Sequence, residues 1–128
     1  MSAALERVPP PYRLLAPLVL MAITFWLSAQ TFDGEVLAWW EVLGRKLGHV
    51  SGYMLLALAW FWALEPHVRN PIPAGVVLTL FYACTDEYHQ TFVDGRTGAT
   101  LDVGIDSIGI TIATVATLVL VRRRSGSD

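Results

Sequence analysis

The sequence predicts an all-α fold, an integral membrane four-helix bundle with both termini in the cytoplasm. Apolar residues make up 54% of the chain, charged residues only 16%, and the mean hydropathy is +0.49, values that are unusual for a soluble domain. These apolar residues gather into four stretches. Because 128 residues suffice for one domain but hardly for two, residues 1–128 are expected to form a single transmembrane unit.

The first predicted span covers residues 14–29, near the lower limit of the about 17 to 25 residues that cross a bilayer as a helix. Arg7 and Arg13 precede it, as basic residues do in a signal peptide. Cleavage after Ala29 would however place Leu27 where a small residue is required. The segment is therefore expected to stay as a helix.

The other predicted spans cover residues 47–64, 72–88 and 103–121, and the second and fourth are apolar over a full membrane thickness. The apolar part of the third ends at Cys84, so this helix crosses only if it continues into the polar "TDEYHQ". Cys84 is the only cysteine, which excludes an internal disulfide, and it is expected to pack as a small buried residue.

The distribution of Lys and Arg predicts the orientation. With the N-terminus inside, six basic residues lie on the inner side and three on the outer side. The inner ones are Arg7, Arg13, Arg69, Arg122, Arg123 and Arg124, and the outer ones are Arg45, Lys46 and Arg96. Two tryptophan pairs, Trp39–Trp40 and Trp60–Trp62, are expected to anchor the chain at the two interfaces, with "DGEVLAWWEVLG" as an interfacial helix.

This topology brings the polar residues to the outer face, where the first and third spans end and the second and fourth begin. Lys46, His49 and Tyr53 follow the i, i+3, i+7 spacing of one helix stripe. Asp102, Asp106 and Gly109 repeat this spacing in the last span. The third span adds Asp86, Glu87 and Gln90. The glycines at 48, 52, 104 and 109 are expected to let helices approach closely.

Charged residues in such positions are costly. An Asp, Lys or Arg near the membrane centre costs about 2.5 to 3.5 kcal/mol on insertion scales, and less toward the interface. Several together persist only if they are paired, hydrated or used. A functional site is the first interpretation, and a structural salt-bridge cluster that ties helix ends together is the alternative.

Three blocks, "KLGHVSGYMLL", "TDEYHQTFVDGR" and "LDVGIDSIGI", together with "SAQ" at the end of the first span, resemble the VanZ-like family of small bacterial membrane proteins. The resemblance covers roughly residues 15–120. The positions that match its pattern are Lys46, His49, Tyr53, Asp86, Glu87, Gln90, Arg96, Asp102 and Gly109. The chain departs from the pattern in the turn before Arg96, which lacks the usual proline, and at Asp106, where asparagine is usual.

The resemblance implies a multi-pass protein of the bacterial inner or plasma membrane. It also implies a link to low-level resistance to the glycopeptide teicoplanin, and it leaves the biochemical activity open. The resemblance therefore predicts the architecture of the protein more directly than it predicts a reaction. Whether the protein is an enzyme stays undecided.

The first functional hypothesis is a site that recognises, or acts on, the anionic headgroup of a phosphorylated cell-envelope lipid. Lys46 and Arg96 would bind phosphate. In an enzyme, His49 would be the general acid or base, with Glu87 or Asp86 as its orienting partner. The remaining residues expected to line the ligand are Tyr53, Gln90, Asp102 and Asp106.

Carboxylates outnumber cations in this set, which opposes a bare anion. Internal pairing would resolve the conflict, and so would a divalent cation such as Mg²⁺ or Ca²⁺ held by Asp86, Glu87 and Asp102. His49 and His89 would instead favour Zn²⁺, but no HExxH motif is present. A metal is the less favoured of these readings.

The second hypothesis is a non-catalytic membrane or partner protein whose polar cluster is a salt-bridge lock, with Glu87 paired to Arg96. Transport ranks third, because the inner halves of the spans are mostly apolar. Membrane lipids are the expected partners. The net charge of −2 gives no reason to expect nucleic acid.

Overall fold

The computed structural model describes residues 7–30, 38–93 and 100–126, and these ranges contain helices but no strand. The short helix α2 (Pro10–Arg13) leads into four long ones. These are α3 (Leu15–Ser28), α4 (Trp39–Leu64), α5 (Pro71–Gln90) and α6 (Thr100–Ser125). The predicted all-α fold with four long helices is confirmed.

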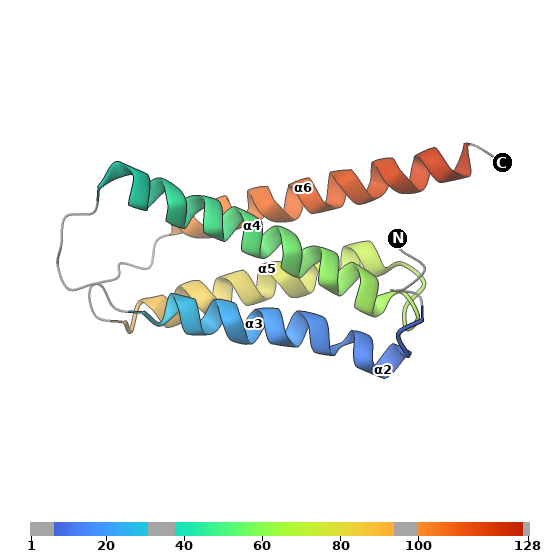
Figure 1. Cartoon of the computed structure of the whole chain (residues 1–128), viewed down its shortest axis with the longest axis horizontal. Helices are drawn as coiled ribbons and strands as arrows, with labels where there is room; N and C mark the ends of the chain where they lie inside the picture. Colours follow the sequence, from blue (N-terminus) through green and yellow to red (C-terminus); the bar gives the residue numbers. More distant parts are fainter. Residues whose placement is uncertain (1–6, 31–37, 94–99, 127–128) are drawn as a thin grey trace.

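Successive helices run in opposite directions, so both ends of the chain lie at the same end of the bundle (Figure 1). At the opposite end, which we call the polar end, α3 and α5 finish and α4 and α6 begin. The helix α4 packs against α3, α5 and α6, whereas no contact joins α3 to α6 within the described ranges. A side chain on α4 can therefore reach each of the other long helices.

Within the described residues, three segments are long and apolar enough to cross a membrane, namely Pro10–Ser28, Trp39–Leu64 and Leu101–Ser125. The predicted third span, which corresponds to α5, is not among them. The helix α5 has 20 residues, and it continues through "TDEYHQ" to Gln90, as the sequence predicts. Its last turns place Asp86, Glu87 and Gln90 in the interior. These polar residues lower the hydropathy of α5, although they belong to the helix and not to a loop.

The helix α4 begins earlier than expected. The sequence predicted a span from residue 47 after a separate interfacial helix, but α4 starts at Trp39 and runs unbroken for 26 residues. Glu41 helps to fix this start, because its carboxylate accepts a hydrogen bond of 2.8 Å from the Ala38 backbone N–H. Trp39 and Trp40 are exposed on the first turn.

The interior is built around α4. The main cluster of buried apolar residues comes from α4, α5 and α6, and its members are Tyr53, Leu56, Ala57, Phe61, Tyr82, Ala83, Ile110 and Ala113. Many large apolar side chains remain exposed on the outside of the helices. A small soluble protein would not leave so much apolar surface in water, and a bilayer would cover it.

Of the four glycines expected to let helices approach closely, one is confirmed in that role. A Cβ atom at Gly109 would overlap the backbone carbonyl oxygen of Val50 and lie 2.9 Å from the backbone nitrogen of Met54, so only glycine allows this approach of α6 to α4. At Gly52 the added atom would make an ordinary contact of 3.7 Å, and at Gly48 and Gly104 it would meet nothing.

The expectation for Cys84 is wrong. Its side chain is exposed, whereas its neighbour Ala83 is buried at 1% exposure. An apolar run in a membrane protein faces lipid as readily as the interior, so hydrophobicity alone did not indicate the buried side of α5.

Candidate functional site

Three polar side chains of α4 follow one stripe from the polar end into the interior. Lys46, His49 and Tyr53 are separated by three and four residues, and each contacts a carboxylate from another helix. The three contacts form successive layers. We call this set, with its partners, the polar column.

The deepest layer is centred on Asp86 of α5, which is only 3% exposed. One carboxylate oxygen accepts a hydrogen bond from the Ser28 hydroxyl of α3. The other accepts bonds of 3.2 Å from the Tyr53 hydroxyl and from the Gln90 side-chain amide. Three donors from three helices therefore satisfy one buried carboxylate, which is what makes such a residue tolerable in the interior.

The middle layer joins α4 to α6. The Nδ1 atom of His49 lies 2.9 Å from Oδ1 of Asp106, and Asp106 is 1% exposed. The imidazole ring also stacks against the Tyr53 ring, with centroids 6.3 Å apart. The sequence had proposed Asp86 or Glu87 as the orienting carboxylate of His49, but the carboxylate in contact is Asp106.

The outermost layer is open. The Nζ atom of Lys46 lies 3.9 Å from Oδ1 of Asp102, a separation longer than a hydrogen bond. The two side chains are 44% and 32% exposed. An ion pair of this length and exposure holds the lysine only weakly, so its ammonium group can turn toward another anion.

Two further residues were expected at the site. Glu87 is buried at 7% exposure on α5. Arg96 and the turn that carries it lie outside the described residues, and so does the pairing proposed between the two. In the parts of the chain that the structure describes, no group of three or more His, Cys, Asp and Glu side chains is arranged to hold a metal ion.

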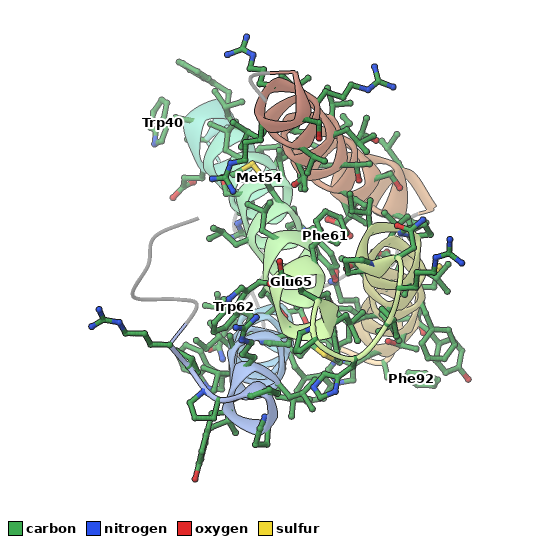
Figure 2. The ribbon with its side chains drawn as sticks, turned by 90° about the vertical axis from the view of Figure 1, so that its right-hand side faces the viewer. Trp40, Met54, Phe61, Trp62, Glu65 and Phe92 are labelled. Atoms are coloured by element: carbon green, nitrogen blue, oxygen red, sulfur yellow. The ribbon has the colours of Figure 1, made fainter. Side chains whose placement is uncertain are left out.

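Sequence reasoning missed a second polar contact, at the end of the bundle that holds the termini. Arg13 is 8% exposed and donates a hydrogen bond of 3.0 Å to Glu65, and its guanidinium lies 5.3 Å from the ring centroid of Trp62. Figure 2 views the bundle from this end and shows Trp62 on the side of α4 that faces α3. The available signal was a pair of opposite charges at the facing ends of two antiparallel helices.

A hydroxyl contact also ties α3 to α5. The Tyr82 hydroxyl donates to the backbone carbonyl of Met21 at 2.6 Å and lies 3.0 Å from the Thr24 hydroxyl. No charge or motif marked these residues beforehand. They fasten the helix that supplies Ser28 to the helix that supplies Asp86.

Comparison with known proteins supports the same family as the motif blocks. The sequence profile of the VanZ/LLP1 family matches residues 13–121, which include the polar column, the whole of α3, α4 and α5, and most of α6. Neither the curated proteins nor the solved structures give a match. The chain thus belongs to the VanZ/LLP1 family and is a membrane protein of that type.

Proposed function

We propose that the polar column binds the anionic headgroup of a phosphorylated cell-envelope lipid. The observation that carries the proposal is the gradient along one stripe of α4, from an exposed Lys46 to a half-buried His49 to a buried Tyr53. A phosphate entering from the polar end would meet the Lys46 ammonium first and the imidazole one turn deeper. Both groups donate hydrogen bonds to phosphate oxygens.

The nearby carboxylates do not defeat this proposal, because two of them already have hydrogen-bond partners inside the bundle. Asp86 accepts three hydrogen bonds, and Asp106 faces His49. Asp102 competes for Lys46 only over 3.9 Å. In addition, α4 and α6 both begin at this end, so the positive ends of their dipoles favour an anion there.

The geometry around His49 also suits a reaction on the bound headgroup. A carboxylate that holds one imidazole nitrogen fixes the ring and stabilises its protonated form. In that role Asp106 would orient the ring, and His49 would exchange a proton with the ligand. Binding and reaction therefore share one site in this proposal.

A direct test is phosphate binding to the purified full chain in phosphatidylcholine nanodiscs, with butyl phosphate as the probe in a phosphorus NMR titration. We expect Lys46→Ala to weaken binding by about tenfold, the loss of one charge-assisted contact, and Lys46→Arg to retain most of it. Arg122→Ala removes a cation at the other end of the bundle and serves as the control. Equal binding by the wild type and Lys46→Ala would refute the proposal.

A second candidate, the non-catalytic lock, is favoured by Asp86. A carboxylate that collects donors from α3, α4 and α5 suits a residue that holds helices together. Under this alternative, butyl phosphate would not bind, and Lys46→Ala would lower only the amount of folded protein in the membrane.

The proposal extends to the teicoplanin resistance that the family resemblance implies. A protein that occupies headgroups of envelope lipids would alter the surface that a glycopeptide meets. We expect expression of the wild type, but not of Lys46→Ala at equal membrane abundance, to raise the minimal inhibitory concentration of teicoplanin. Equal minimal inhibitory concentrations for the wild type and Lys46→Ala would show that resistance does not depend on this site.

A further inference from the structure

A groove of about 310 Å³ lies between α5 and α6. Residues of both helices line it, chiefly Val76, Leu80, Ser107, Ile110, Thr111 and Thr114. This volume is at the lower end of the range of about 300–1,000 Å³ typical of small-molecule pockets.

The groove is apolar in spite of its hydroxyl groups. Ser107, Thr111 and Thr114 each donate to a backbone carbonyl one turn earlier in α6, at 2.7, 2.7 and 2.8 Å. With their hydroxyls bonded to their own helix, these residues offer no free donor to a ligand. A polar molecule would lose hydration there without compensation, whereas a hydrocarbon chain would not.

The α6 wall of the groove leads toward the polar column. Ile110, which lines the groove, lies one helical turn beyond Asp106 on the same face of α6. A molecule lying along the groove would therefore point one end at the layer that contains His49 and Asp106.

We infer that the α5–α6 groove binds the hydrocarbon chain of the same lipid whose phosphate headgroup the polar column binds. This inference rests on the proposed function and gives its ligand a second part, a single long chain attached to the phosphate. Headgroup and chain then contribute to affinity separately, and a lipid with the right headgroup but a short chain binds weakly.

The test compares two probes with the same headgroup, hexadecyl phosphate and butyl phosphate, on the full chain in phosphatidylcholine nanodiscs. Thr111→Phe adds a ring at an exposed position on the groove wall, and Ile112→Phe adds the same ring at the next residue, outside the groove. We expect Thr111→Phe to weaken hexadecyl phosphate binding by about tenfold, equivalent to roughly two methylene groups that no longer fit. Ile112→Phe should have no effect.

Butyl phosphate separates the possible failures and also reports folding. If the wild type binds both probes equally, or if Thr111→Phe binds hexadecyl phosphate as the wild type does, the groove inference is wrong and the headgroup proposal stands. If the wild type binds neither probe, the headgroup proposal is wrong and the inference falls with it. Unchanged butyl phosphate binding by Thr111→Phe, with weakened hexadecyl phosphate binding, supports the inference.

Discussion

At the scale of single residues, Asp86 and Lys46 mark two different kinds of polar group. Asp86 is buried and accepts three hydrogen bonds, so its contacts are already complete. Lys46 is 44% exposed and touches Asp102 only at 3.9 Å, so it can change partner. In the proposed function, the deep layer of the polar column is therefore structural, and Lys46 in its open layer contacts the ligand.

Removing the carboxylate of Asp86 should destabilise the protein. In Asp86→Ala the Ser28 and Tyr53 hydroxyls and the Gln90 amide lose their acceptor, and each buried group left without a partner costs about 1–3 kcal/mol. Asp86→Asn keeps an acceptor oxygen and should lose less. Thermal unfolding in detergent would measure both, and an Asp86→Ala melting temperature equal to that of the wild type would contradict the anchoring role.

Neutralising Asp102 should strengthen anion binding. In Asp102→Asn the weak pair with Lys46 is lost, which frees the ammonium and removes a repulsive charge from the mouth of the site. We expect the dissociation constant for butyl phosphate to fall by up to about fivefold, which corresponds to a surface pair of up to about 1 kcal/mol. Weaker binding would mean that Asp102 contributes to the ligand site itself.

At the scale of helices, the sequence was most informative where spacing and polarity agreed. The stripe of Lys46, His49 and Tyr53 and the helical extension of the third span to Gln90 followed from periodicity and from the length that a bilayer requires. The carboxylate that faces His49 did not follow, because Asp86, Glu87 and Asp106 all reach the same end of the bundle. Only helix rotation and packing select among them.

The close approach of α4 and α6 gives a test with a matched control. Gly109→Ala would force the new methyl group against the Val50 carbonyl, and overpacking of this kind costs about 1–3 kcal/mol. Gly104→Ala makes the same change one and a half turns earlier in α6, where nothing lies within 4 Å. We expect a lower melting temperature for the first variant and an unchanged or higher one for the second.

At the scale of the whole molecule, the two ends of the bundle differ in chemistry. The polar end carries the polar column, whereas the other end has the Arg13–Glu65 pair and finishes with three consecutive arginines after the apolar part of α6. The antiparallel order of the helices could be predicted from the expectation that each apolar stretch crosses the membrane once. Arg13 was not expected to be a buried contact, since an arginine before a first span usually lies at the membrane surface.

The orientation of the bundle is the remaining prediction of the basic-residue count. With six basic residues on the inner side and three on the outer side, the polar end should face outward. Because Cys84 is exposed, the test starts from Cys84→Ser and adds one cysteine at an exposed position, either Gln30→Cys at the polar end or His67→Cys between α4 and α5. A membrane-impermeant thiol reagent on intact cells should label the first and spare the second, and permeabilised cells should label both. The reverse pattern would place the polar column on the cytoplasmic face. The lipid headgroup in the proposed function would then have to come from the inner leaflet of the membrane, not from the outer leaflet.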